Sequence, residues 1–253
     1  MKTENLKKIL LAFVPVVILI IVWTYATDSG RVPEAVLPKI SSVGNAFVTS
    51  LQSGQLQNDL KESLGCVLKG YLSAALIGII LGSLIGMFKT VKYIFQPTIT
   101  CIRSIPMIAW MPMIILWCGI GQLSKVVLIV IAAVFPILVN TQGGIESTPE
   151  GLVEVADLYK FNPVNKFLRV YLPNSLPHIL VGLKLGLSVS WMAVVGAELI
   201  ASTAGIGYRL SNARSMMQSA TLVLCMIVVG VIGIFMDRIL GLIFGSLTPW
   251  EKK

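Results

Sequence analysis

Residue types that commonly carry enzyme chemistry are scarce in this chain. It has a single histidine, His178, which excludes a metal site built from several histidines. Its cysteines are far apart and show no C-x-x-C spacing, so we expect free thiols that behave as small apolar residues at Cys66, Cys101, Cys118 and Cys225. The sequence contains no G-x-x-x-x-G-K-[ST] stretch, so the chain cannot hold ATP phosphates in a P-loop. We predict no catalytic residue, no metal site and no cofactor bound by this chain.

The side chains that could act on a solute are charges inside apolar segments. Arg103 and Lys184 lie several residues inside such segments, and Glu198 lies near the end of one. An unpaired charge in a membrane is costly, so each cation needs water, a partner or a lipid headgroup. Two interpretations are open: the cations reach the interface through their long side chains, or they face a pathway and attract an anion. Apolar walls of that pathway would come from Met107, Trp110 and Trp191. For Glu198, gating, contact with an outer protein and simple exposure are all open.

The elements that position these residues are membrane helices. Hydrophobic residues make up 55% of the chain, charged residues 13%, and the mean hydropathy is +0.84. A membrane span needs about 20 mostly apolar residues. Six segments qualify, namely Ile9–Ala26, Val67–Phe88, Thr98–Cys118, Val126–Gly143, Ile179–Ala201 and Met216–Met236. We therefore predict an all-α polytopic membrane protein with six transmembrane helices in one domain, residues 1–253. The first segment resembles a signal peptide, but its length and the lack of an A-x-A cleavage site favour a retained span.

The distribution of basic residues predicts the orientation. With six spans, eleven of the 20 Lys and Arg residues fall on the side of the termini and seven on the other side. The excess places both termini in the cytoplasm. The net charge of +8 is then mostly a topology signal, and nucleic-acid binding is not needed to explain it.

A polar segment of about residues 146–177 interrupts the apolar pattern on the cytoplasmic side. Thr148-Pro149 is a helix start signal, and Asn162-Pro163 repeats it fourteen residues later. Leu172-Pro173 should end the second helix, because proline disfavours the helical conformation of the residue before it. We expect a short helix, a turn and a second short helix exposed at the membrane face. Such an element fits a docking site for a cytoplasmic partner.

The first of these helices has two different faces. Leu152, Val155, Ala156 and Tyr159 follow the spacing of one helix face, while Glu150, Glu154 and Asp157 lie on the other side. A helix lying on the membrane surface is the alternative. Such helices tend to be basic on the polar face, whereas this one is acidic, so docking to a protein is favoured.

The spans carry features for close packing and for bending. Ala74, Gly78, Gly82 and Gly86 recur every four residues and form a small-residue face, as do Gly182, Gly186 and Ser190. These faces fit a seam within one subunit or between two. The third span contains Pro97, Pro106 and Pro112, each of which should kink it. A broken helix in the membrane needs protein or a water-filled cavity around it, so a substrate site and a kink that only shapes packing are both open.

The polar segment also resembles the EAA loop of binding-protein-dependent ATP-binding-cassette (ABC) importer permeases. Glu154-Val155-Ala156 followed by Leu172-Pro173 carries this resemblance, which extends from about Val36 to Arg238 and is to the nitrate, sulfonate and taurine branch. Its further matches are Arg103 to Pro106, Ala109, Pro112, Ile115 to Gly121, Ser124-Lys125, Gly182 to Lys184, Trp191, Ala197-Glu198, Gly205 to Tyr208 and Asp237-Arg238. The resemblance implies a type I importer permease fold in the prokaryotic inner membrane.

In that family the EAA loop docks into a groove on a cytoplasmic ATPase subunit. The resemblance implies that nine residues make this contact: Glu150, Glu154, Val155, Ala156, Leu158, Tyr159, Lys160, Leu172 and Pro173. The family usually has glycine where this chain has Lys160. Lysine resists the left-handed conformation that glycine tolerates, so we expect mild strain or a different turn there.

The resemblance further implies an importer made of two copies of this chain, two ATPase subunits that bind ATP and Mg, and an extracytoplasmic solute-binding protein. This chain would form the pathway for a small anion of the sulfonate, taurine or nitrate type and would catalyse no reaction. Because other relatives carry heterocyclic vitamin precursors, that substrate class stays open. The alternative function is a self-contained secondary transporter, which should show an internal repeat and several intramembrane acids, and neither is evident.

Overall fold

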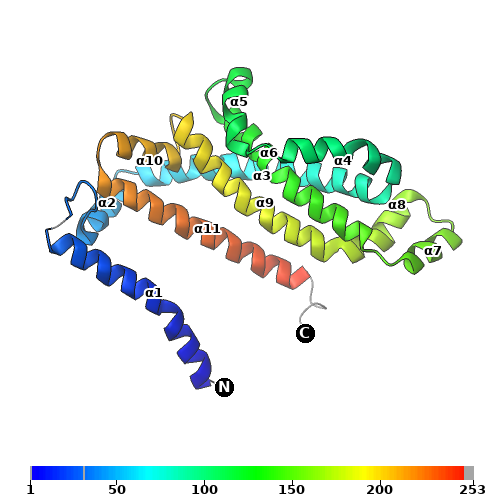
Figure 1. Ribbon diagram of the computed structural model, residues 1–253, viewed down its shortest axis with the longest axis horizontal. Helices are drawn as coiled ribbons and strands as arrows, with labels where there is room; N and C mark the ends of the chain where they lie inside the picture. The colour runs from blue at the N-terminus through cyan, green and yellow to red at the C-terminus, as the bar shows by residue number, and fades with distance from the viewer. Residues whose placement is uncertain (1, 31, 248–253) are drawn as a thin grey trace. The chain divides into compact units, whose positions relative to one another are not determined.

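The computed structural model describes residues 2–30 and 32–247, with side chains from residue 14 to residue 245 apart from residue 31. Every regular element in these residues is helical, which confirms the all-α class. The elements are α1 (Lys2–Asp28), α2 (Ile40–Gln52), α3 (Gln55–Met87), α4 (Lys89–Arg103), η1 (Met107–Trp110), α5 (Met111–Cys118), α6 (Gln122–Glu146), α7 (Glu150–Leu158), α8 (Pro163–Lys166), η2 (Phe167–Tyr171), α9 (Leu172–Ile200), α10 (Ile206–Ser215) and α11 (Ser219–Leu247) (Figure 1).

The chain divides into two compact units. Unit 1 comprises Met1–Gln57 with Arg209–Val228, and unit 2 comprises Asn58–Tyr208 with Val229–Lys253. Within unit 1, the link between α1 and α2 is held by hydrogen bonds to its carbonyl groups. Trp23 Nε1 donates to the Pro38 carbonyl at 2.8 Å, and Ser219 Oγ donates to the Glu34 carbonyl at 2.6 Å. Both tryptophan and serine thus satisfy backbone acceptors that no helix pairs.

The core of unit 2 is α6, which packs against α3 on the predicted small-residue face. Added Cβ atoms on Gly78, Gly82 and Gly86 would lie only 2.7–2.9 Å from atoms of α6, so the two backbones approach closely. Ala74, the fourth member of this face, is fully buried in a cluster with residues of α6. The seam therefore lies within one chain.

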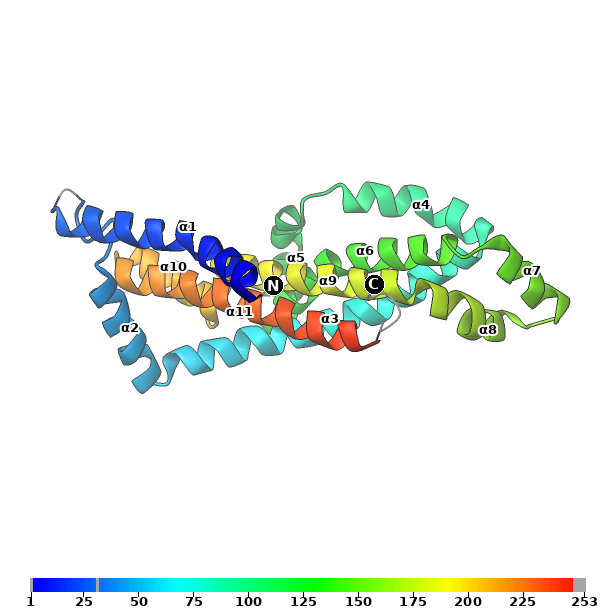
Figure 2. The same ribbon diagram turned by 90° about the horizontal axis from the view of Figure 1, so that it is seen from below.

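The second small-residue face packs α9 against α6 as well. A Cβ atom on Gly182 would lie 2.8 Å from Cβ of Asn140, and one on Gly186 would lie 2.7 Å from Cδ1 of Ile137. Figures 1 and 2 show these helices side by side. Both seams left open by the sequence are thus internal to the subunit, and α6 holds α3 and α9 together.

The third predicted span is interrupted, as its prolines indicated, but the expectation that each of the three prolines kinks it was wrong. The pair Lys89–Arg103 and Met107–Cys118 is bent by 90° at a short break. Pro106 lies in the break, whereas Pro97 sits inside α4 and Pro112 occupies the first turn of α5, where its missing N–H has no helical partner to lose. One proline of the three therefore interrupts the span.

The polar segment also differs from its prediction at both ends. The side chain of Thr148 does not cap α7; it lies 3.2 Å from Asn174 Nδ2, and Pro149 takes the cap position. The second helix does not end at Leu172-Pro173. It passes through the π-helical turn η2 into α9, because the wider turn accommodates the missing N–H of Pro173. The cap at Asn162 is confirmed, since its side chain accepts from the Asn165 amide at 2.7 Å.

Four helices of the described residues are long and apolar enough to cross a membrane. They are Gln55–Met87, Gln122–Glu146, Pro163–Ile200 and Ser219–Gly245, and the bent pair forms a fifth if it counts as one span. Each begins or ends several residues away from the sequence prediction. The apolar helix Val14–Asp28 overlaps the first predicted span, Ile9–Ala26, whose side chains before residue 14 lie outside the described residues. Six spans are compatible with this arrangement.

Candidate functional site

The turn after α7 has the geometry expected for glycine but carries lysine. Lys160 adopts φ +52°, in the left-handed region. The Phe161 amide donates to the Ala156 carbonyl at 3.0 Å and the Lys160 amide donates to that of Asp157 at 2.9 Å, a Schellman motif. The turn therefore keeps the glycine conformation, and Lys160 bears the strain of about 1–2 kcal/mol that an L-residue meets there.

The exposed face of α7 and the following helix enclose an apolar groove. Its volume is about 480 Å³, and its lining includes Leu152, Val155, Ala156, Tyr159, Phe161 and Pro173. Ala156 is only 2% exposed and forms the floor, whereas Leu158 is 82% exposed beyond it. Lys166 Nζ and Asp157 Oδ1, 2.8 Å apart, tie α8 to α7. Among the apolar residues predicted for coupling, Ala156 is thus an internal contact, whereas Val155, Leu158 and Tyr159 are exposed.

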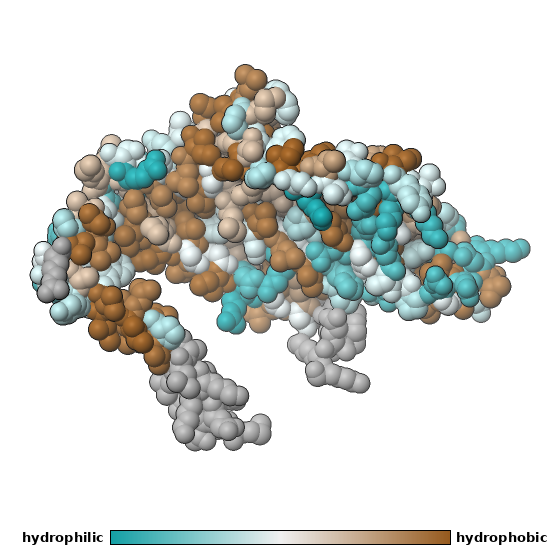
Figure 3. Space-filling view, in the orientation of Figure 1, coloured by the Kyte–Doolittle hydropathy of each residue, from teal (hydrophilic) through white to brown (hydrophobic). Residues whose placement is uncertain are grey.

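The acidic face of α7 borders a different, polar pocket. Glu150 and Glu154 line it together with Lys89 and Lys92, within about 610 Å³. Lys92 Nζ lies 2.9 Å from Glu146 Oε1 and joins α4 to α6 beside it. In Figure 3 hydrophilic side chains gather toward α7 and α8, and hydrophobic ones cover α5. This end of unit 2 therefore carries the polar side chains expected where a membrane protein meets water.

A cavity lies at the bend between α4 and α5. It measures about 410 Å³ and is lined by Arg103, Met107 and Trp110, with Phe135 and Asn140 of α6. Three predicted pathway residues therefore share one cavity. Arg103 has no carboxylate partner among the residues that the structure describes. Its cation can therefore attract an anion, and the amide of Asn140 adds a polar group to the same wall.

The other predicted pathway residues lie elsewhere. Lys184 Nζ lies 3.1 Å from Asp237 Oδ1, so its charge is compensated by α11. Trp191 is buried and its Nε1 donates to the Val229 carbonyl at 3.0 Å. A separate pocket of about 560 Å³ is lined by Trp191, Met192 and Asp237. The structure does not bring Lys184 and Trp191 to the cavity at Arg103.

Glu198 is buried rather than exposed at a surface. It is 1% exposed, and Lys125 of α6, which is 2% exposed, lies 3.5 Å from its carboxylate. Lys125 also pairs with Glu62 at 3.0 Å. Hydrogen bonds from Ser63 and the Gly207 amide complete this Glu198 network. A buried carboxylate is stable here because each of its oxygens has donors.

Sequence reasoning missed the partners of these charges. Asp237, Glu62 and Lys125 each pair with a residue far along the chain, and Asn140 joins the cavity from another helix. Asp237 and Lys125 were noted only as matching residues of the resemblance. Each lies at the very end of a predicted apolar segment, next to Val126 or Met236, and that position was the one signal that a compensating charge should exist. Among the residues whose side chains are described, no cluster of His, Cys, Asp or Glu could hold a metal ion.

Comparison with known proteins gives consistent relatives. The family described as binding-protein-dependent transport system inner membrane component matches residues 74–248. A putative aliphatic sulfonates transport permease protein of Bacillus subtilis is 32% identical, covering 93% of this chain and 85% of its own length. The nitrate import permease protein of Leptolyngbya laminosa is 34% identical over 77% and 70% of the two chains. The taurine transport system permease protein of Escherichia coli is 31% identical over 87% and 79%.

Solved structures share the fold. A chain of the MetNI methionine ABC transporter, in an inward-facing conformation, superposes with a TM-score of 0.59 at 21% identity. The match covers 75% of this chain and 96% of that one. The likeness at this identity concerns the arrangement of the helices.

Proposed function

Since the chain belongs to the family of binding-protein-dependent transport system inner membrane components, in its nitrate, sulfonate and taurine branch, we propose that it forms the translocation pathway of an ATP-driven importer. It is a multi-pass membrane protein of the type I permease fold. The observation that carries the proposal is that the end of α7 presents the exposed apolar side chains of Leu158 and Tyr159, and that this helix connects through α8 and η2 to the span α9.

The partner for this segment is a cytoplasmic ATPase subunit that binds ATP and Mg. Leu158 and Tyr159 project from the end of α7, and the adjoining groove can take an apolar side chain of the partner. Two copies of the chain, two ATPase subunits and an extracytoplasmic solute-binding protein make the complete importer. Both termini lie in the cytoplasm, on the side of α7. The chain itself transmits motion and catalyses no reaction.

The solute is a small anion of the sulfonate, taurine or nitrate type. Arg103 supplies positive charge at a cavity whose other lining residues are uncharged. Broken backbone at membrane depth must face protein or water, and residues 104–106 form such a break beside this cavity. The cavity therefore belongs to a pathway completed by the second copy of the chain. Weak attraction suffices, because a permease has to release what the binding protein delivers.

Motion would reach this pathway through α9. Closure of the two ATPase subunits on ATP displaces α7 and α8, and the pathway changes from inward to outward access. Hydrolysis then resets it. A ligand can shift such an equilibrium only by its different affinity for the two states, so ATP must bind the closed pair more tightly.

Purification of the tagged chain from its native membrane tests the proposal. An ATPase subunit should copurify, and proteoliposomes with the complex and the binding protein should take up a labelled sulfonate, taurine or nitrate only with ATP. Uptake of a heterocycle instead would support the importer function but contradict the proposed substrate class. Uptake driven by an ion gradient without any ATPase would establish a secondary transporter and overturn the proposal.

A further inference from the structure

The far end of α9 is fixed to the loop that follows it by the Glu198 network. Ser63 Oγ lies 2.8 and 2.9 Å from the two carboxylate oxygens of Glu198 and donates its proton to that carboxylate. The Ile206 amide donates to Ser63 Oγ at 3.0 Å, and the Gly207 amide donates to Glu198 Oε2 at 3.0 Å. The first amides of α10, which have no helical partner, are thus satisfied from α3 and α9.

The backbone of this loop rests directly on the carboxylate. Gly205 has φ +111°, and a Cβ atom there would overlap Glu198 Oε1. A Cβ atom on Gly207 would lie 2.6 Å from the Val195 carbonyl oxygen of α9. The amide of Gly205 also lies 3.3 Å from Asp59 Oδ1 of α3. Glycine is required at both positions, because any side chain would lift the loop from α9.

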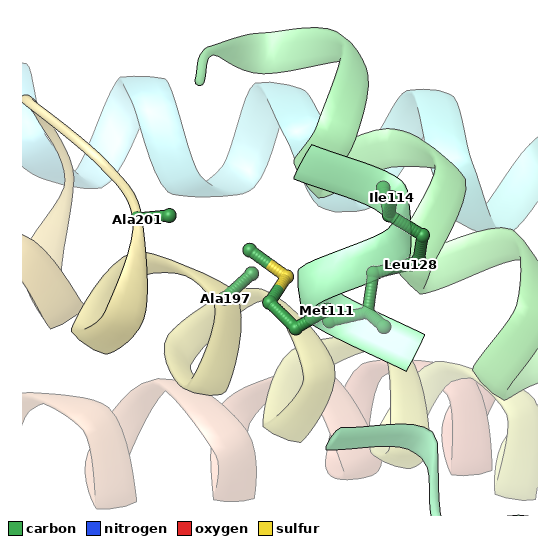
Figure 4. Close-up of a cluster of buried hydrophobic side chains, with 5 residues drawn as sticks. All are labelled: Met111, Ile114, Leu128, Ala197 and Ala201. Atoms are coloured by element: carbon green, nitrogen blue, oxygen red, sulfur yellow. The ribbon is translucent and has the colours of Figure 1, made fainter. Parts of the chain in front are cut away.

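Lys125 makes the attachment electrostatic as well. It stands between Glu62 of α3 and Glu198 of α9, and almost no water reaches it. Separating these helices would leave a buried charge without its partner, which is strongly unfavourable. Figure 4 shows the same end of α9, with Ala197 in its last turn and Ala201 just after it, and with Met111 of α5 directed toward Ala197. Apolar packing and ion pairs therefore both hold this end of α9 against its neighbours α3, α5 and α6 at one junction.

The helix α9 links this junction without a break to the coupling segment, which is the stretch from α7 to η2. It runs 29 residues from Leu172, and at about 1.5 Å per residue its length is roughly 43 Å. Its first turn continues η2 and α8. If the proposed function holds, displacement of α7 and α8 by an ATPase enters α9 at one end and reaches the Glu198 network at the other.

We propose that Glu198 is a positioning residue that makes the loop of residues 201–207 move with α9 as one rigid body. The loop then responds to ATP at the opposite membrane face from the ATPase. Glu198 touches no solute in this account; it acts by holding the loop through Ser63, Lys125 and the Gly207 amide. The inference rests on the proposed function, because it requires ATP to displace α9.

The wild-type arrangement can be tested with spin labels in the reconstituted complex. Labels at the exposed positions Val181 and Thr203, in a chain whose native cysteines are replaced, are separated by most of the length of α9. The 181–203 distance should stay the same with and without trapped ATP, while the distance between the two Thr203 labels of the dimer changes. A 181–203 distance that changes as much would overturn the rigid attachment. ATP-driven uptake would then still support the importer.

Variants separate positioning from folding. Ser63→Ala removes the link from Ile206 to Glu198 but keeps both ion pairs, and Ser73→Ala, whose hydroxyl bonds only its own helix, is the control. Ser63→Ala should broaden the 181–203 distance distribution and raise the ATP hydrolysed per solute several-fold, and Ser63→Thr should restore both. An unchanged ratio in a well-folded Ser63→Ala complex would contradict the proposal. If the Ser63→Ala complex does not assemble, the 181–203 distances in the wild-type complex, with and without ATP, decide whether the loop moves with α9. If ATP caused neither a displacement nor uptake, the proposed importer function would be contradicted as well.

Discussion

Lys184 of α9 and Asp237 of α11 form an ion pair with Nζ and Oδ1 3.1 Å apart, within two membrane helices. Both side chains are about half exposed, at 42% and 45%. Lys184 therefore has a carboxylate partner, whereas Arg103 has none among the described residues. From the sequence, the same two interpretations were open for both cations. The pair fastens α9, the helix that continues the coupling segment, to the last span.

Neutralising one partner of this pair should destabilise the protein, and neutralising both should restore part of the loss. Lys184→Gln or Asp237→Asn leaves one charge in the membrane without compensation. Thermal unfolding of both single variants and the double variant should give a coupling energy of about 1 kcal/mol, as expected for a polar contact between membrane helices. Additive effects of the two changes would show that the contact contributes nothing.

Arg103→Gln should slow uptake of an anionic solute while basal ATP hydrolysis stays near that of the wild type. The cavity would lose its one cation, whereas the coupling segment is distant from it along the chain. Arg103→Lys should retain much of the uptake, because the charge remains. Arg238→Gln, which removes an exposed arginine outside this cavity, is the control. Normal uptake by Arg103→Gln would remove electrostatic attraction from the pathway and leave an interfacial role for this arginine.

Ala156 should act through the packing of the coupling segment. Its side chain is only 2% exposed, so a larger residue at this position would have to displace its neighbours. Ala156→Leu should destabilise the packing of α7 against η2 by about 1–3 kcal/mol, as overpacked sites do. Proteolysis of the segment should become faster, and the same change at exposed Gly151 should not accelerate it. Equal protease resistance of wild type and Ala156→Leu would contradict this account.

Lys160→Gly should stabilise the turn after α7. Relief of left-handed strain is worth about 1–2 kcal/mol, and the extra freedom of glycine in the unfolded chain offsets about 0.4–1 kcal/mol. The expected gain is small, and Lys160→Val should instead be destabilising, because a β-branched residue resists φ +52° more strongly. Hydrogen exchange of the Phe161 amide, which closes the turn, would measure the stability of the turn in both variants. Faster exchange in Lys160→Gly would show that the lysine is not strained.

The seams of the fold could be predicted because they follow local spacing. Small residues at every fourth position place a flat face on one side of a helix, and Gly78, Gly82 and Gly182 do pack closely. The partner of each face was not predictable, because spacing on one helix does not identify the other. The same limit applies to Lys184, whose partner lies 53 residues later on α11.

Proline gave weaker signals, because its effect depends on position. Pro97, Pro106 and Pro112 look alike in sequence, yet Pro106 alone lies at the bend. Pro112 falls in the first turn of a helix, where proline is well tolerated. Pro173 was expected to end a helix, but a π-helical turn before it carries the helix onward. The Glu198 network likewise depends on a hydrogen bond between residues 135 apart.

The most direct test of the central claim is a crosslink between this chain and an ATPase. A single cysteine at position 158, in a chain without the four native cysteines, would be treated with a short bifunctional reagent in inverted membranes. Position 164 on α8 is the matched control, because Val164 is also exposed but borders a groove with α3. We expect a product of this chain joined to one ATP-binding subunit from position 158 and little or none from position 164. Failure to recover any ATPase from position 158, with the cysteine shown to be reactive from the cytoplasmic side, would contradict the coupling role of α7.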